Sequence, residues 1–258
     1  MYLKRKADAY LNAWKSDPNR SPLIIKGPRQ VGKTETIDYF AAHNYRSVVE
    51  INFVEEPKYR AITADGYGAD TIVRNISLID PAKKFIPGDT LIFFDEIQAH
   101  PDIATALKFF KIDGKYDVIC SGSMLGISYK QIESNSVGYK TDYEMRSLDF
   151  EEFLWARGYD EAVIESMFTH LCDATPFSEV EMNVFSTAFM DYCVLGGMPA
   201  VVASHIRTGT FEGTLQLQRQ LILDYQEDIR KYAQGLDQAR ILNVFNHIPV
   251  QLAKENKK

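Results

Sequence analysis

Short apolar runs and stretches of helical periodicity alternate along the first half of the chain. Apolar runs bounded by turn residues predict strands, and apolar positions spaced three and four apart predict helices. The predicted strands cover residues 23–25, 47–53, 90–96, 116–121 and 138–145. The predicted helices cover residues 2–15, 35–42, 57–64, 71–79 and 102–111. This alternation predicts an α/β domain with a parallel sheet and helices on both faces.

The pattern changes near Ser147. Helical periodicity continues over residues 149–159, 161–171, 179–195 and 214–232, and no predicted strand alternates with it. We therefore predict an α/β domain over residues 1–147 and a smaller all-helical domain over residues 148–258. Near the end, Pro249 is expected to interrupt an amphipathic helix over residues 238–247, and a second apolar helix is expected to follow.

A glycine-rich turn, GPRQVGKT, joins the first predicted strand to the helix that follows it. Its G-x-x-x-x-G-K-[ST] spacing is typical of a phosphate-binding loop. Gly27 and Gly32 permit backbone angles that turn successive N–H groups toward one anion, and the helix N-terminus adds its positive dipole end. We expect Lys33 to reach the terminal phosphates of a nucleotide and Thr34 to bind Mg²⁺.

The residues expected to contact nucleotide are Gly27, Pro28, Arg29, Gln30, Val31, Gly32, Lys33, Thr34 and Glu35. A chance match in a turn is the alternative interpretation of this motif. The apolar strand before the loop and the helix after it favour the phosphate loop, because the motif requires that setting.

A second motif, TLIFFDE, ends the strand predicted over residues 90–96. Four consecutive apolar residues indicate a strand buried on both faces, and its two acids emerge at the carboxyl end, where open α/β sheets bind ligands. We expect Asp95 to hold Mg²⁺ opposite Thr34, and Glu96 to polarise a water against the γ-phosphate. The alternative is a pair of solvated acids that cap the following helix.

The strand predicted over residues 116–121 ends in Ser121-Gly122-Ser123. A small polar residue at this point, beside the phosphate loop, can sense the γ-phosphate or orient the attacking water. An ordinary turn cap is an equal alternative. We carry Ser121 and Ser123 forward as catalytic candidates.

The composition limits the classes of protein to consider. A net charge of −6 over 258 residues argues against a generic nucleic-acid binder, although not against a local basic patch. Cys120, Cys172 and Cys193 have no metal-binding spacing, so reduced, buried thiols in a cytoplasmic protein are expected. The sequence predicts neither a signal peptide nor a membrane span.

The motifs GPRQVGKT, LIFFDEIQ, ICSGSMLG, SLDFEEFLWARG and GGMPAVV, in this order, resemble the prokaryotic AAA-type P-loop ATPases that carry an uncharacterised C-terminal domain. The resemblance implies a P-loop NTPase sheet of strand order 5-1-4-3-2, and ATP with Mg²⁺ as ligands. It also implies phosphate binding by Lys33, metal binding by Thr34 and Asp95, catalysis by Glu96, and a sensor at Ser121 or Ser123.

This chain departs from the resembled family at two places. Pro28 replaces an alanine that many relatives have, and Gly138-Tyr139-Lys140 replaces a Gly-Arg or Gly-Lys pair. Arg146, Lys140 and Arg29 are therefore the candidates for an arginine finger or its equivalent. Relatives continue into a winged-helix segment and a nuclease-like domain. We expect residues 236–258 to begin the winged helix and the chain to be a fragment of a longer protein.

The leading functional hypothesis is an ATPase in which Mg²⁺-dependent hydrolysis drives a rearrangement between the two predicted domains, with slow turnover in isolation. A non-hydrolytic, ATP-dependent switch that orders an interface for a protein or DNA partner is the alternative. Charges at Asp228, Arg230 and Lys231 could contact such a partner. A phosphotransferase acting on a small acceptor is a third possibility, and the oligomeric state is left open.

Overall fold

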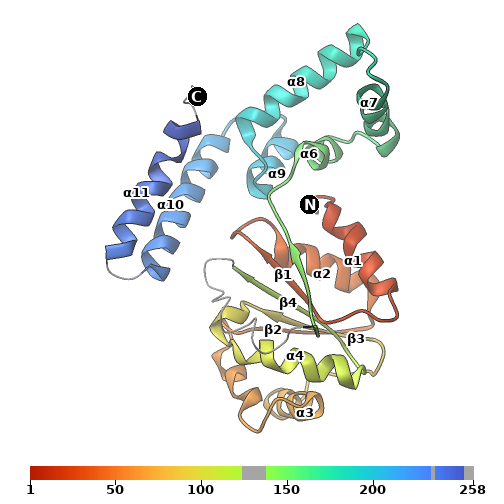
Figure 1. The fold of residues 1–258 in the computed structure, drawn as a ribbon, viewed down its shortest axis with the longest axis vertical. Helices are drawn as coiled ribbons and strands as arrows, with labels where there is room; N and C mark the ends of the chain where they lie inside the picture. The colour runs from red at the N-terminus through yellow and green to blue at the C-terminus, as the bar shows by residue number, and fades with distance from the viewer. Residues whose placement is uncertain (124–137, 234–235, 253–258) are drawn as a thin grey trace. The chain divides into compact units, whose positions relative to one another are not determined.

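The computed structural model describes residues 1–123, 138–233 and 236–252, and within them five strands form one parallel sheet (Figure 1). The strands are β1 (Leu23–Gly27), β2 (Ser47–Asn52), β3 (Thr90–Asp95), β4 (Asp117–Ser123) and β5 (Thr141–Glu144). Their order across the sheet is β2-β3-β4-β1-β5, and each neighbouring pair is parallel. The predicted order 5-1-4-3-2 is therefore confirmed.

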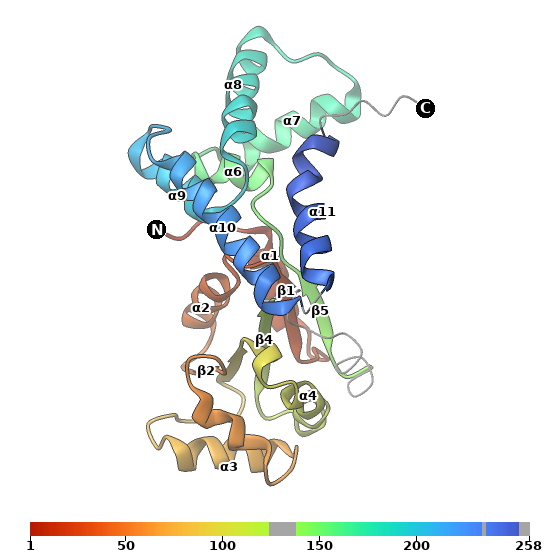
Figure 2. The same cartoon turned by 90° about the vertical axis from the view of Figure 1, so that its left-hand side faces the viewer.

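Helices cover both faces of the sheet (Figure 1, Figure 2). The helices on one face are α1 (Lys6–Ser16) and α2 (Lys33–Asn44), and those on the other are η1 (Pro57–Thr63), α3 (Ala69–Ile79) and α4 (Asp102–Asp113). Successive strand side chains point to opposite faces, so one apolar run supplies both cores. In β3, Leu91 and Phe93 belong to the core under α1 and α2, whereas Ile92 and Phe94 belong to the other core.

A run of helices follows β5. These are α6 (Phe150–Ala156), α7 (Glu161–Asp173), α8 (Glu179–Leu195) and α9 (Pro199–Thr208). Asp149, Asp160 and Ser178 cap the first three, because each side chain accepts a backbone N–H of the first turn. The hydrophobic pattern does not predict α9, since Gly196, Gly197 and Pro199 at its start are typical of a turn. The prediction of buried thiols is wrong for Cys172 in α7 and Cys193 in α8, which are exposed, and holds for Cys120 in β4.

The chain divides into two compact units, residues 1–210 and residues 211–258. The architecture changes from strands to helices between Glu144 and Phe150, within the first unit. The domain limit predicted near Ser147 coincides with this change and stays a prediction.

In the second unit, α10 (Thr214–Tyr232) and α11 (Leu236–Leu252) pack against each other, and Gln226 Nε2 donates to Asn246 Oδ1 at 3.0 Å. The predicted interruption at Pro249 is wrong, because α11 continues through that residue. Pro249 lies in the last turn, where its missing N–H removes a single hydrogen bond. Residues 253–258 lie outside the described residues, and the winged-helix segment predicted over residues 236–258 stays a prediction.

Two glycines allow backbone segments to approach closely around the helical run and β5. The Leu148 N–H donates to the Gly197 carbonyl at 2.7 Å, and a Cβ on Gly197 would lie 2.0 Å from the Leu148 carbonyl oxygen. Likewise, a Cβ on Gly27 would lie 2.1 Å from the Met145 carbonyl oxygen. These contacts leave no room for a side chain, so glycine at both positions fixes how the start of α9 and the end of β1 pack.

The segment after β3 is anchored by a buried histidine. Glu96 has left-handed backbone angles (φ 54°), the short helix η2 (Ile97–Ala99) follows, and His100 ends the segment. The His100 ring centroid lies 5.0 Å from that of Phe53, and its Nε2 lies 3.0 Å from Thr63 Oγ1. Burial, together with the charge of Arg60, lowers the pKa of His100 below its usual 6.5, and Asp102 opposes this shift.

Gly197→Ala is expected to lower the free energy of unfolding by about 1–3 kcal/mol, because the added methyl group overlaps the Leu148 carbonyl. Urea denaturation measures the change. Gly68→Ala is the matched control, since Gly68 has an ordinary φ of −61° and its added Cβ would lie 3.5 Å from Thr71 Oγ1. The control is expected to change stability by less than about 0.5 kcal/mol. Equal effects of the two substitutions would contradict the close approach.

His100 is expected to make the folded protein lose stability as the pH falls. Its pKa is lowered in the folded state, so the unfolded chain takes up the proton first, and stability is lost from about pH 6.5 down toward the folded pKa. His100→Gln should therefore lose less unfolding free energy between pH 7 and pH 5 than the wild type. Urea denaturation at each pH measures this, with the exposed His43→Gln as control. The same pH dependence in wild type and His100→Gln would exclude the effect.

Candidate functional site

The phosphate-loop motif forms the connection between β1, which ends at Gly27, and α2, which begins at Lys33. Gln30 (φ 63°) and Gly32 (φ 91°) adopt left-handed backbone angles, so the chain turns sharply at both. The prediction that Gly27 supplies such angles is wrong, because Gly27 has no positive φ and instead permits the close approach to Met145. The sequence motif indicates that a loop is present, but it does not indicate which of the loop residues have left-handed backbone angles.

Lys33 points into this loop. Its side chain is buried, and Nζ donates to the carbonyl oxygens of Gly27 at 3.0 Å and Pro28 at 2.7 Å. Burial lowers the pKa of Lys33, and the carboxylates of Glu96 and Asp95 oppose that shift. Lys33 is therefore a cation held at the mouth of the loop by neutral carbonyls and nearby acids. Pro28, which lacks an N–H, takes part through its carbonyl.

Asp95 is the most densely bonded acid of the site. Its side chain is buried and accepts from Thr34 Oγ1 at 3.3 Å, from Asn52 Nδ2 at 3.3 Å, from the Glu96 N–H at 2.9 Å and from the Ser121 hydroxyl. The structure thus brings together Thr34, Asp95 and Ser121, which the sequence places far apart. Asn52 was not among the predicted residues. Its signal is the strand register, in which Asn52 pairs with Asp95 at the ends of β2 and β3.

The oxygens of Thr34 and Asp95 fit a magnesium ion. Mg²⁺ prefers hard oxygen ligands, and a hydroxyl 3.3 Å from a carboxylate oxygen is suited to neighbouring positions around one ion. Among the described residues no group of three or more His, Cys, Asp or Glu side chains is arranged to hold a metal. An ion at this point would therefore depend on phosphate and water for its remaining ligands.

Glu96 follows the end of β3 and has left-handed backbone angles, unlike Asp95, which belongs to the strand. Gln98 Nε2 donates to Glu96 Oε2, which fixes the carboxylate within its own segment. Gln98 Oε1 is buried and has no hydrogen-bond partner among the described residues. Gln98 was also not predicted, although it lies within the LIFFDEIQ motif. The catalytic role of Glu96 stays a prediction.

Ser121 and Ser123 both belong to β4 and are almost fully buried. Ser121 lies within the strand and so is not a turn cap, whereas the role of Ser123 at the end of the strand stays a prediction. In the sheet register Ser121 pairs with Ile25 and Ser123 with Gly27. Ser123 is therefore beside the first glycine of the loop, whereas Ser121 contacts Asp95. The rest of the ICSGSMLG motif, from residue 124, lies outside the described residues.

Two of the three candidate finger residues, Arg146 and Lys140, flank β5 and pair with acids of that strand. Arg146 is 78% exposed and its Nε lies 3.1 Å from Glu144 Oε1. Lys140 Nζ lies 2.9 Å from each carboxylate oxygen of Asp142. Arg29 lies in the loop itself, and its charge contributes to the lowered pKa of Lys33. A finger role for any of them stays a prediction.

The remaining predicted contact, Glu35, is exposed in the first turn of α2.

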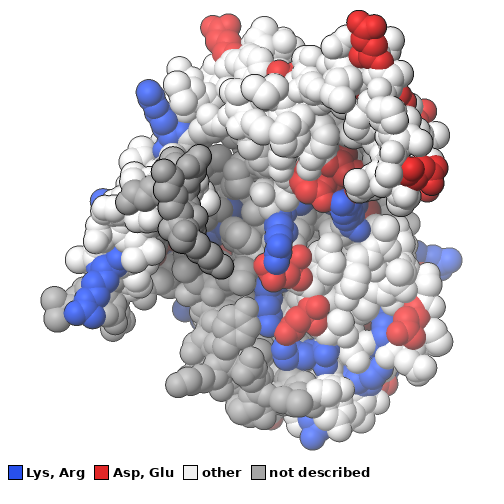
Figure 3. Space-filling model, turned by 45° about the horizontal axis from the view of Figure 1, so that its top comes forward, with Lys and Arg blue, Asp and Glu red and all other residues white. Residues whose placement is uncertain are grey.

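Figure 3 shows lysines and arginines interleaved with acids on the face in view, rather than gathered in a patch of one sign.

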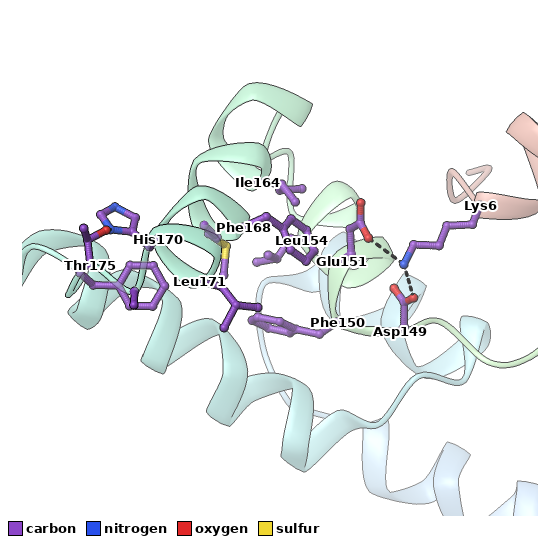
Figure 4. Close-up of a pocket in the computed structure, with 13 residues that line it drawn as sticks. Lys6, Asp149, Phe150, Glu151, Leu154, Ile164, Phe168, His170, Leu171 and Thr175 are labelled. Atoms are coloured by element: carbon purple, nitrogen blue, oxygen red, sulfur yellow. Dashed lines mark hydrogen bonds and ion pairs between the residues drawn. The ribbon is translucent and has the colours of Figure 1, made fainter.

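A cavity of about 720 Å³ lies away from the loop, between α6 and α7 (Figure 4). Its walls are mainly apolar, with Phe150, Leu154 and Phe168 among the lining residues, and Lys6 pairs with Asp149 and Glu151 at one end. It contains none of the predicted nucleotide ligands.

No described helix is both long and apolar enough to cross a membrane.

The family model of an AAA domain matches residues 19–154, and that of a domain of unknown function (DUF8612) matches residues 186–258. No curated protein matches.

Similar solved structures include PCH-2 of C. elegans, at 11% identity and a TM-score of 0.36 over 67% of this chain and 48% of that one. AMPPCP-bound DnaA from Aquifex aeolicus matches at 14% identity and a TM-score of 0.44, over 89% of this chain and 68% of that one. The chain thus spans about half the length of PCH-2. Because the AAA model covers more than half of the sequence and includes both the loop and Asp95, the chain belongs to the AAA domain family of nucleotide-binding ATPases.

Proposed function

We propose that this protein binds Mg²⁺·ATP at the phosphate loop and hydrolyses the β–γ phosphoanhydride. The observation that carries the proposal is the convergence of three groups at the carboxyl ends of β1 and β3. Lys33 Nζ lies against the loop carbonyls, and Thr34 Oγ1 lies 3.3 Å from the buried Asp95 carboxylate. Ligands of open α/β sheets bind at this edge.

Each group has a chemical role in the proposed reaction. Lys33 exchanges its two carbonyl acceptors for terminal phosphate oxygens, which are stronger acceptors because they are charged. Thr34 and Asp95 would hold Mg²⁺, which neutralises phosphate charge when it is bound. Asn52 and Ser121 orient the Asp95 carboxylate by donating to it.

Glu96 is the proposed base. It accepts a proton from a water whose oxygen attacks the γ-phosphorus, the bond from that phosphorus to the β–γ bridging oxygen breaks, and the electron pair of that bond leaves with ADP. Gln98 holds the carboxylate, and Ser121 or Ser123 is the proposed sensor of the γ-phosphate. An arginine finger contributes about 10³–10⁵ to the rate of related reactions. Because Arg146 is exposed and paired with Glu144, slow turnover by the isolated chain is expected.

One observation favours a second function, a non-hydrolytic switch. The Glu96 carboxylate already has a hydrogen-bond donor in Gln98, and this bond occupies one of the acceptor positions that an attacking water could use. A protein that keeps this bond when ATP is bound would hold nucleotide without cleaving it. Such binding would order the nucleotide site for a protein or DNA partner.

Lys33→Ala is expected to weaken ATP binding about 100-fold, because a charged hydrogen-bond donor to phosphate is lost. Isothermal titration calorimetry at millimolar magnesium measures the affinity. The exposed Lys84→Ala is the matched control and should bind like the wild type. Wild-type protein that binds no ATP would refute the proposed function.

Glu96→Gln is expected to keep the ATP affinity and to lower hydrolysis by about 10²–10⁴, since the general base is lost. Single-turnover phosphate release under saturating ATP measures the rate, and the exposed Glu55→Gln is the control. No phosphate release by the wild type, with binding intact, would favour the switch. Unchanged release by Glu96→Gln would remove Glu96 from the proposed role, and labelled phosphate on another acceptor would indicate a phosphotransferase.

A further inference from the structure

A buried arginine that belongs to neither motif contacts the phosphate loop. Arg5 precedes α1 in an extended conformation and is 4% exposed. A Cβ built on Gly32 would lie 3.5 Å from Arg5 Nη1, so the guanidinium lies next to the second glycine of the loop. An arginine this deeply buried is uncommon unless its charge and its donors are paired.

The guanidinium donates in three directions. Nη1 reaches the Val31 carbonyl oxygen at 2.7 Å, Nη2 reaches the Arg146 carbonyl oxygen at 2.6 Å, and Nε reaches Glu152 Oε1 at 3.1 Å. Arginine suits this position because its planar fork is always charged and presents donors in fixed directions. Lysine, a point charge on a flexible stem, cannot reproduce the three contacts together.

The contact with Val31 determines the orientation of one peptide of the loop. In a planar trans peptide the carbonyl and the following N–H point in opposite directions. Arg5 holds the Val31 carbonyl toward itself, so the Gly32 N–H is directed away from Arg5. That N–H belongs to the motif whose amides are expected to surround phosphate.

Glu152 connects the same arginine to the start of α6. Its Oε1 also accepts the Lys6 N–H at 2.7 Å, and its Oε2 accepts the Asp149 N–H at 3.1 Å. The Lys6 ammonium adds ion pairs to Asp149 at 2.5 Å and to Glu151 at 2.7 Å (Figure 4). A continuous set of hydrogen bonds and ion pairs therefore joins the segment before α1, the phosphate loop and the first turn of α6.

We propose that Arg5 is a positioning residue of the nucleotide site. It holds the Val31–Gly32 peptide in the orientation that binds the phosphates of a nucleoside triphosphate, and through Glu152 it links that peptide to α6. The inference rests on the nucleotide binding proposed above. Coupling of this kind is reciprocal, so nucleotide that stabilises the loop also stabilises the first turn of α6.

Arg5→Lys tests the positioning role, because it keeps a cation near Glu152 and loses the fork. We expect its Kd for Mg²⁺·ATP to rise about ten-fold, which corresponds to about 1.4 kcal/mol. KM should rise with Kd, while the single-turnover rate at saturating ATP stays within about two-fold of wild type. The matched control is Arg46→Lys, an 83% exposed arginine that pairs with Asp89 at the surface and should leave Kd unchanged.

Several outcomes would overturn the inference. If Arg5→Lys lowers only the melting temperature and the folded variant binds ATP with the wild-type Kd, Arg5 is structural and the proposed function stands. If the wild type binds no ATP, both proposals fail. Equal weakening by Arg46→Lys would also refute a specific role for Arg5.

Hydrogen exchange tests the link to α6 on the wild-type chain, and decides the case if Arg5→Lys does not fold. Mg²⁺ with a non-hydrolysable ATP analogue is expected to slow exchange of the amides from Leu148 to Phe153. In Glu152→Gln, which removes the ion pair with Arg5, this slowing should be smaller by at least about half. Exchange that does not respond to the analogue in a wild type that binds it would overturn the link.

Discussion

Parallel pairing of the strands is the constraint on which the candidate site depends. Because neighbouring strands run in one direction, their carboxyl ends meet at one edge of the sheet. Asn52 pairs with Asp95 in this way, and Gly27 pairs with Ser123. The strands β1 and β3 are buried along their whole length between the helices of the two faces, and the polar groups of the candidate site lie where these strands end. The chemistry proposed for this protein is located at this edge for that reason.

The charged groups buried at this edge form hydrogen bonds with neutral partners that a ligand can replace. Lys33 donates to two backbone carbonyls, and the Asp95 carboxylate accepts the Thr34 hydroxyl. Burying an unpaired charge is costly, and these neutral partners reduce the cost without cancelling either charge. Under the proposed function, polyphosphate and a divalent ion would supply opposite charges in the same places. Burial lowers the pKa of Lys33, which indicates that its positive charge is not fully compensated by its partners. Bound phosphate would supply the missing negative charge.

The sequence predicts those parts of the molecule that depend on local spacing. The loop from Gly27 to Thr34 and the strand that ends at Asp95 are motifs of adjacent residues, so a linear pattern is sufficient to find them. Asn52, Gln98 and Arg5 were missed because their contacts depend on strand register, on a left-handed turn and on a distant segment that returns to the loop. The path of α11 through Pro249 was mispredicted for another reason. A proline in the last turn of a helix removes little hydrogen bonding.

The groups proposed to bind nucleotide and those proposed to cleave it are supported by different parts of the first unit. The loop is held from outside by Arg5, whose other bonds lead to Glu152 and α6. Glu96 is held by Gln98 on the segment that the buried His100 anchors against Phe53 and Thr63. A contact that displaces α6 therefore acts first on the loop and on affinity. A contact that displaces the segment after β3 acts first on the proposed base and on turnover. Under the proposed mechanism the fold thus allows affinity and turnover to be controlled separately, because no bond described between Arg5 and its partners involves the Glu96 segment.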